Sequence, residues 1–388
     1  KGFKTAGVAS GLKKNGGKDI GLIYSEVPAI AAGVFTKNMV QAAPVLLDRE
    51  RIKLGKCQAV IVNSGNANCC TGEQGMRDAT AMAGFAASSL GISEDLVLVA
   101  STGVIGQPLD TGKIKVAMPE LVKNIKPDGV TNFAEAIMTT DTVPKVVTRQ
   151  GKMEGKPYTV TGVAKGSGMI RPDMATMLCF VMSDVKISHD LLTEALLSAT
   201  DKSFNRITVD GDTSTNDTIL VLANGLSGAT VKNPVHKESF QIVLDEVLTD
   251  LAKMVVKDGE GATKLVEIMI KGALTDKDAY KIADTISNSN LVKTALFGED
   301  ANWGRILAAA GRAGVKIDPY KADIFFDDVI IAKNGMWCGE KAEDEAAKIL
   351  KKNEFGISVN LNMGQGSASI FTCDFSVEYV KINADYRS

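Results

Sequence analysis

The chain has 388 residues, of which 45% are hydrophobic and 23% are charged, and its formal net charge is −2. This length and composition are typical of a globular protein with two or three packed units. The balanced charge argues against a nucleic-acid or anionic-membrane surface, because both need a basic excess, and no apolar run approaches the roughly 20 residues that span a bilayer.

The first half of the chain alternates predicted strands and helices. Short β-branched or apolar runs between Gly, Pro and Asn predict strands, and apolar residues on one helical face, such as Met76, Ala79 and Met82, predict helices. The predicted strands cover 3–11, 19–26, 31–38, 57–65 and 95–102, and the predicted helices cover 73–90, 110–122 and 132–138.

The second half continues this alternation. Strands are predicted at 176–184, 218–225, 266–274, 354–362 and 369–380, with more than one strand within 323–332, and helices at 189–203, 237–257, 276–288, 302–312 and 342–352. Strands mixed with helices, many of them hairpin-like, indicate an α+β sandwich more than a doubly wound sheet. The segment after about residue 275 is long enough to bury its own core, so we predict domains at 1–275 and 276–388.

Cysteines and histidines limit the chemistry that the chain can perform. The six cysteines form no CxxC pair and are too sparse for a disulfide scaffold, which favours a reduced, cytoplasmic setting. The neighbours Cys69 and Cys70 lack a second ligand pair with zinc spacing, so we expect no metal site. The two histidines, His189 at a predicted helix start and His236 in a polar loop, lie in no polar cluster, which disfavours Ser-His-Asp or Cys-His catalysis.

The polar run 209–217, with the sequence VDGDTSTND, invites a calcium-binding interpretation. An EF-hand loop counted from Asp210 needs Gly at its sixth position and Glu at its twelfth, where this chain has Thr215 and Val221. We reject that interpretation. The run is either a plain polar turn before a strand or a support for a nearby active site.

A lone threonine, Thr176, lies where the loop 165–175, KGSGMIRPDMA, becomes a predicted strand. A threonine hydroxyl can act without histidine if its own α-amino group, with a pKa near roughly 7.7–8.0, serves as the base. That requires the Thr176 hydroxyl to attack the Ala175 carbonyl, and water to release the new amino terminus from the ester. Threonine is also a common β-former, so the residues alone leave self-cleavage and a plain strand start both open.

The segment KGSGMIRPDMATML closely resembles the cleavage and nucleophile segment of the ornithine acetyltransferase (glutamate N-acetyltransferase) family. Other segments look like family motifs in family order and span nearly the whole chain: VNSGNAN, STGVIG, MTTDT, DGDTSTNDT, KDGEGATK, GEDANWGR and NADYRS. The resemblance implies an αββα sandwich of the self-cleaving, N-terminal-nucleophile-like type. It also implies a smaller C-terminal α/β unit whose tail returns to the active site.

The family's functional residues map onto matching positions of this chain. Thr176 resembles the nucleophile, freed by cleavage after Ala175 into an α segment (1–175) and a β segment (176–388), and Thr102 and Gly103 match the oxyanion-hole pair. Substrate-contacting positions match Thr139, Lys165, Glu260, Asn383 and Ser388. Within MTTDT, Thr140 is the alternative to Thr139. The family commonly ends in Thr where this chain has Ser388, so the hydroxyl is retained.

The resemblance implies acetyl transfer from N2-acetylornithine to glutamate in arginine biosynthesis, through an acetyl-threonine intermediate and with ping-pong kinetics. Lys165 would meet a substrate carboxylate and Glu260 a substrate cation; the alternative for Lys165 is a part in the cleavage geometry. No resident cofactor is implied, and acetyl-CoA stays open as a co-substrate because no CoA motif is visible. Two αβ units are expected to associate as α2β2.

Two other functions compete with this one. An amidase or aminopeptidase of the related self-cleaving hydrolase fold would use water instead of glutamate as the acceptor. An inactive binding protein on the same scaffold would not need an intact Thr176 with its supporting residues, which this chain retains.

Overall fold

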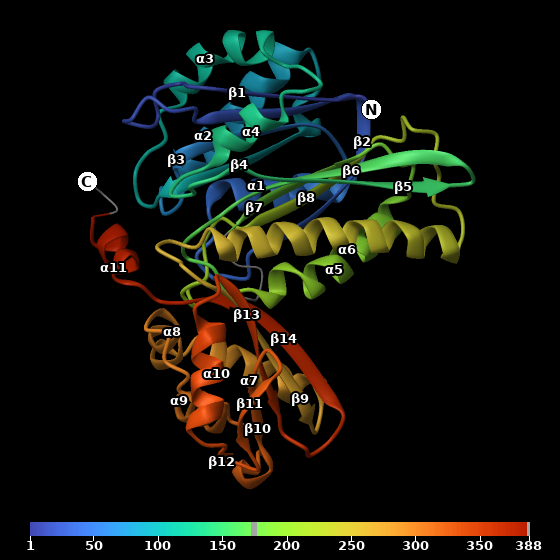
Figure 1. Cartoon of the computed structure of the whole chain (residues 1–388). Helices are drawn as coiled ribbons and strands as arrows, with labels where there is room; N and C mark the ends of the chain where they lie inside the picture. Colours follow the sequence, from blue (N-terminus) through green and yellow to red (C-terminus); the bar gives the residue numbers. More distant parts are fainter. Residues whose placement is uncertain (172–176, 386–388) are drawn as a thin grey trace. The chain divides into compact units, whose positions relative to one another are not determined.

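The computed structural model describes residues 1–171 and 177–385. They form two compact units, which we treat separately (Figure 1). Unit 1 comprises the described residues of Lys1–Asn205 and Asp212–Val255, and unit 2 comprises Arg206–Gly211 and the described residues from Val256 onward. The boundary expected near residue 275 stays a prediction, because compactness does not test whether the segments fold independently.

Unit 1 is built on an eight-stranded sheet with the order β4-β3-β2-β8-β7-β6-β5, and β1 pairs with β2 outside this path. The strands are β1 (Phe3–Val8), β2 (Ile20–Phe35), β3 (Lys56–Asn66), β4 (Val97–Val104), β5 (Lys145–Met153), β6 (Lys156–Lys165), β7 (Leu178–Ser183) and β8 (Thr218–Ala223). The helices are α1 (Ala43–Arg51), α2 (Gly72–Leu90), α3 (Thr111–Lys123), α4 (Val130–Ile137), α5 (His189–Lys202) and α6 (Pro234–Lys257).

Strand β2 joins the two halves of this sheet. Two separate strands were expected over 19–26 and 31–38. This prediction was wrong, because the structure has a single strand whose pairing with β3 is irregular between Tyr24 and Ala29. Its first half pairs with β1 and its second half pairs with β8. The break in the sequence pattern at Pro28 looks like a turn, because proline cannot donate to a sheet ladder, but here it lies in the irregular stretch of one strand.

The two halves of the sheet pack on each other across a shared core. Val60 and Leu98 from one half and Phe180 and Leu220 from the other belong to a single buried cluster. Phe133 of α4 meets Phe180 edge-on at 5.6 Å between ring centroids, and burying such a side chain contributes about 1.5–3 kcal/mol.

Helices cover the outer faces of both halves. Helices α2 and α3 pack on the half that contains β3 and β4, and α6 packs on β6, where Gly162 leaves room for Val247 and Leu251 (Figure 1). Layers of helix, sheet, sheet and helix result, which confirms the predicted α+β, αββα sandwich.

Unit 2 contains a six-stranded sheet with the order β12-β11-β10-β13-β9-β14. Its strands are β9 (Leu265–Ala273), β10 (Asp323–Phe326), β11 (Val329–Lys333), β12 (Met336–Trp337), β13 (Glu354–Asn360) and β14 (Gly366–Cys373). Its helices are α7 (Asp276–Ser287), α8 (Asn290–Phe297), α9 (Trp303–Gly311), α10 (Glu340–Leu350) and α11 (Val377–Ala384). Ile268, Ile282 and Ile357 help to form its buried core, as expected for a smaller α/β unit.

Two further local predictions were wrong. The strand expected over 369–380 ends at Cys373, and α11 begins at Val377 because the Ser376 side chain accepts from the Tyr379 amide and caps a new helix. His236, expected in a polar loop, lies in the first turns of α6, which begins at Pro234.

Within residues 1–171 and 177–385, no helix combines the length and apolar character needed to cross a membrane.

Candidate active site

A small pocket in unit 1 collects residues from several strand ends. Seven residues line it: Thr102, Lys165, Met177, Leu178, Ser214, Asn216 and Asp217. Strands β7 and β8 run in parallel with Leu178 beside Thr218, and β6 pairs antiparallel to β7 with Lys165 beside Leu178. The end of β6 and the starts of β7 and β8 therefore meet at one edge of the sheet.

Thr102 and Gly103 lie near the end of β4, where its pairing with β3 becomes irregular. Gly103 has a φ of +133°, and a Cβ atom there would lie 2.4 Å from the backbone carbon of Gly65. Only glycine fits this conformation and this close approach without strain. The glycine therefore fixes the backbone that carries the Thr102 side chain.

The Lys165 side chain connects two of the predicted site residues. Its Nζ donates to Thr139 Oγ1 at 2.9 Å and to Thr102 Oγ1 at 3.2 Å, and the residue is only 6% exposed. Thr140 Oγ1 instead lies 2.7 Å from Ser167 Oγ. The contact with Lys165 favours Thr139 over Thr140 as the threonine of MTTDT that belongs to the site.

A buried carboxylate, Asp141, lies behind Lys165. Burial alone would raise the pKa of Asp141, but the charges of Lys165 and Lys145, with hydrogen bonds from Lys145 and the Thr139 amide, lower it to about 2. Asp141 is therefore ionised at neutral pH. With its carboxylate and the two ammonium groups counted together, the cluster carries a formal charge of +1, which suits an anionic ligand group.

The polar run before β8 supports the end of β4. Asn216 Nδ2 donates to the Ser101 carbonyl at 2.8 Å and to the Ala67 carbonyl at 2.6 Å. Ser101 immediately precedes Thr102, so this amide ties the candidate oxyanion strand to the entry of β8. Of the two interpretations of the run, a support for the site accounts for these contacts, and no group of His, Cys, Asp or Glu that could hold a metal occurs in the described part of the chain.

Two further predicted site residues meet within unit 2. Asn383 Nδ2 donates to Glu260 Oε2 at 2.8 Å. The loop that carries Glu260 is held by Asp374, whose carboxylate accepts from the Thr263 and Lys264 amides at 2.8 and 2.9 Å. The Glu260 side chain is thus placed by a hydrogen-bonded loop and by α11.

The remaining predicted site residues, Ala175, Thr176 and Ser388, lie outside the described residues. Met177, the residue next to Thr176 in the chain, lines the pocket together with Thr102 and Lys165.

Several residues of this site were absent from the predicted set, among them three charged residues around Lys165. Asp141 and Lys145 belong to the stretch MTTDTVPK, where a carboxylate and a lysine four positions apart were the available signal. Lys13 also faces the cluster: burial lowers its pKa, and the charge of Lys165 lowers it further, while Asp19 opposes this shift. Burial and proximity of these charges could not be read from the sequence.

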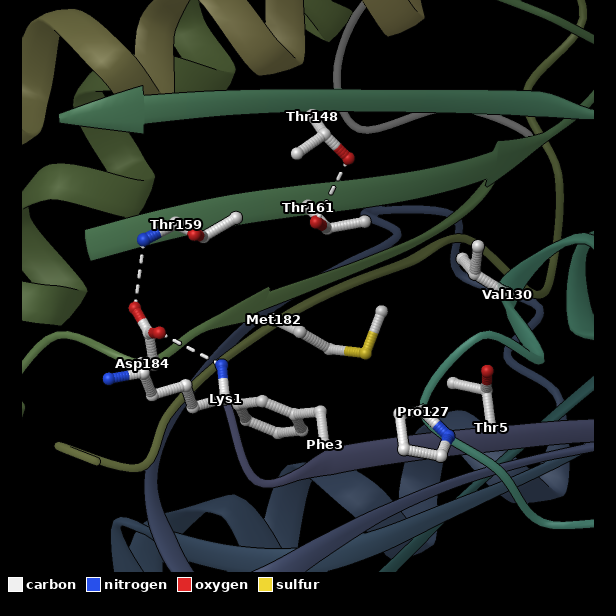
Figure 2. A pocket seen from close by; sticks show the side chains of 10 residues that line it. All are labelled: Lys1, Phe3, Thr5, Pro127, Val130, Thr148, Thr159, Thr161, Met182 and Asp184. Atoms are coloured by element: carbon white, nitrogen blue, oxygen red, sulfur yellow. Dashed lines mark hydrogen bonds and ion pairs between the residues drawn. The ribbon is translucent and has the colours of Figure 1, made fainter. Parts of the chain in front are cut away.

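A second cleft in unit 1 has a different character. Figure 2 shows threonines of β5 and β6 on one side, among them Thr148 and Thr161, whose hydroxyls lie 3.0 Å apart. Asp184 also lines it and accepts from the Thr159 amide at 2.8 Å. The ten residues that line this cleft include none of the predicted site residues.

Comparison with known proteins identifies the family. The model of the ArgJ family matches residues 4–388. The arginine biosynthesis bifunctional proteins ArgJ of Geobacter sulfurreducens and Syntrophotalea carbinolica are 50% and 51% identical to this chain, over 100% of it and 99% of each relative. A crystal structure of the Bacillus halodurans protein of that name has 42% identity and a TM-score of 0.50, covering 53% of this chain and 97% of its own. The chain belongs to the ArgJ family.

Proposed function

We propose that this protein is a glutamate N-acetyltransferase that moves the acetyl group of N2-acetylornithine to glutamate in arginine biosynthesis. The Thr176 hydroxyl attacks the acetyl carbonyl, ornithine leaves with the proton on its amine, and Thr176 becomes an acetyl ester. The glutamate amine then attacks this ester, which regenerates the hydroxyl and releases N-acetylglutamate.

One observation carries the proposal: the residue that follows Thr176 lines the same pocket as Thr102 and Lys165. The proposed nucleophile is therefore adjacent in the chain to Met177, which lines a pocket together with a threonine hydroxyl and a buried cation. Such donors stabilise the negative oxygen of the tetrahedral intermediate, and the loss of one costs about 3–4 kcal/mol in activation free energy. We assign Thr102 and Gly103 to this oxyanion hole.

The charges of the site suit the proposed substrates. Both N2-acetylornithine and glutamate carry a carboxylate that the +1 cluster around Lys165 attracts. Glu260, a residue that is 8% exposed, would bind the protonated amine of ornithine. Thr139, Asn383 and Ser388 stay predictions as further substrate contacts.

The nucleophile requires cleavage of the Ala175–Thr176 bond, so that the new α-amino group serves as the base. A relative with a crystal structure supports this part of the proposal. The match covers 97% of the relative's chain but only 53% of the present chain. A chain of about half the length is what a molecule made of two cleavage products contains.

Mass spectrometry of the purified protein, together with an acetyl-transfer assay, tests the proposal. We expect two fragments, 1–175 and 176–388, and transfer of labelled acetyl from N2-acetylornithine to glutamate. Replacing Thr176 with Ala should abolish both cleavage and transfer. A single uncleaved chain in fully active protein overturns the threonine mechanism.

The assay also separates the alternatives. Release of acetate to water as fast as transfer to glutamate would replace the transferase by an amidase or aminopeptidase. Acetyl-CoA enters only as an alternative acetyl donor, with no resident cofactor proposed, and an assay with acetyl-CoA and glutamate decides whether it is used. We also propose a cytoplasmic location and an α2β2 assembly. Analytical ultracentrifugation should show this assembly as the sedimenting species.

A further inference from the structure

Three charged side chains form a buried group beside the pocket, which we call the lysine–aspartate cluster: Asp141, Lys145 and Lys165. Lys145 Nζ donates to Asp141 Oδ1 at 2.7 Å, and Lys165 Nζ lies 3.9 Å from Asp141 Oδ2. The side chains of Asp141 and Lys145 are both 0% exposed. One carboxylate therefore faces two lysines, of which only Lys145 makes a short contact with it.

Asp141 also holds the backbone from which its neighbours project. Its Oδ1 accepts from the Gly166 amide at 2.7 Å, and its Oδ2 accepts from the Thr139 amide at 3.0 Å. Gly166 follows Lys165 directly, and Thr139 is a hydrogen-bond partner of Lys165. A single carboxylate thus fixes both the base of the Lys165 side chain and one of the hydroxyls that its ammonium group contacts.

The contact between Lys165 and Thr102 determines the direction of a hydrogen bond. An ammonium group can only donate, so Thr102 Oγ1 accepts from it and must direct its own hydrogen elsewhere. Among residues 1–171 and 177–385, no acceptor for that hydrogen is found against Thr102. Since Thr102 lines the pocket, its hydroxyl is available as a donor to a group bound there.

Lys145 explains why Asp141 does not disturb this arrangement. A buried carboxylate with no other cation would draw Lys165 into a direct ion pair and away from the threonine hydroxyls. Because Lys145 takes Oδ1, Lys165 stays at 3.9 Å from Oδ2 and within 3.2 Å of Thr102 Oγ1.

We propose that Asp141 is a positioning residue for acetyl transfer, with Lys145 as its neutralising partner. It acts through Lys165, whose position makes the Thr102 hydroxyl a donor to the oxygen that becomes negative in the tetrahedral intermediate. This inference rests on the proposed function, which does not itself assign Asp141 or Lys145.

The decisive variant is the double substitution Asp141→Asn with Lys145→Met. It removes one negative and one positive charge, so the net charge near the substrate carboxylate is unchanged, and Lys145 is not left buried without its carboxylate partner. We expect kcat to fall about tenfold to a hundredfold, because a misplaced oxyanion donor weakens transition-state binding. We expect KM for N2-acetylornithine to change less than about threefold, because ground-state attraction depends on the conserved charge.

Asp184→Asn is the matched control. Asp184 is also buried, at 4% exposure, and its carboxylate also accepts from a backbone amide, that of Thr159 in β6, but it lies in the other cleft. This variant should lower the melting temperature and leave kcat unchanged. Mass spectrometry on the same samples gives the cleaved fraction, to which each kcat is referred.

The assay uses two acetyl donors, N2-acetylornithine and p-nitrophenyl acetate. If the wild-type protein is acetylated by the ester but not by acetylornithine, the proposed function is wrong. The burst rate with the ester then tests whether Asp141 positions the oxyanion donor. A folded, cleaved double variant with wild-type kcat or burst rate overturns the positioning proposal, as does an equal loss in Asp184→Asn.

Discussion

Lys165 in unit 1 and Lys293 in unit 2 are both buried cations that donate to a threonine hydroxyl. Lys293 is 2% exposed and donates to Thr372 Oγ1 at 2.9 Å and to the Cys373 carbonyl. The Thr372 hydroxyl donates its own hydrogen bond to the Ser287 carbonyl at 3.1 Å. In unit 2 the threonine that accepts from the lysine thus donates in turn to a backbone carbonyl of the protein.

In unit 1 the corresponding hydroxyl lines a pocket. Thr102 accepts from Lys165 at 3.2 Å and borders the pocket with it. The comparison teaches that burial and hydrogen bonding of a lysine do not by themselves indicate function. What distinguishes the two lysines is the surroundings of the accepting hydroxyl, which borders a pocket in one case and donates to a backbone carbonyl in the other.

Replacing Thr102 with Val tests this difference with the largest expected effect. The variant keeps the shape of the side chain and loses the hydroxyl, so kcat for acetyl transfer should fall about 10²–10³-fold. Steady-state kinetics on cleaved protein measures it. A Thr102→Val enzyme within threefold of wild type would show that the hydroxyl donates nothing to the intermediate.

Acid should affect the surroundings of Lys165 and leave those of Lys293 unchanged, because the hydrogen bonds of Lys293 go to neutral groups. The folded-state pKa of Asp141 is about 2, below its ordinary value of 3.8. At pH values above 3.8 the ionised form of Asp141 therefore stabilises the fold by about 2 kcal/mol. This contribution is lost as the pH falls toward 2.

Chemical denaturation between pH 7 and pH 2.5 measures this loss. Asp141→Asn removes the titrating group, so its free energy of unfolding should vary less over this range than that of the wild type. Equal pH dependence in the two proteins would contradict the assignment of a depressed pKa to Asp141.

Thr372→Val gives the opposite pattern to Thr102→Val. It deprives Lys293 of an acceptor and Ser287 of a donor, so the free energy of unfolding should fall by about 1 kcal/mol. Denaturant melts measure this change, and kcat per folded molecule should match the wild type. A selective loss of kcat in this variant would erase the distinction between the two lysines.

The smallest effect is expected for Thr140→Val, because the Thr140 hydroxyl contacts Ser167 rather than Lys165. We expect kcat to change less than about threefold, a difference of well under 1 kcal/mol. Thr139→Val, which removes an acceptor of Lys165, is the matched comparison and should be slower. The reverse order would move the site assignment from Thr139 to Thr140.

Much of the fold was predictable because its local patterns are regular. The helix that begins at His189 and the strand β8 were predicted nearly to their ends. Strands β5 and β6 were not predicted, and the wrong predictions arose where a local pattern has two structural meanings. Pro28 interrupts a pattern without ending the strand, and alternating apolar residues around Val377 and Tyr379 are typical of a strand but belong to a capped helix.

The site divides in the same way. Family motifs named Thr102, Gly103, Thr139 and Lys165, and the structure brings these residues together in unit 1. Asp141 lies in the same motif as Thr139 but was not predicted as a site residue. Its proposed role depends on its burial between two lysines, which the sequence does not show.

The sequence by itself determined the family, the order of the motifs and the types of side chain that carry the chemistry, because these depend only on residues close together in the chain. Tertiary structure decided which threonine Lys165 contacts, the low pKa of Asp141, and the difference between Thr102 and Thr372. Each of these depends on distances between residues far apart in the chain and on the exclusion of water, which strengthens electrostatic interactions between buried groups.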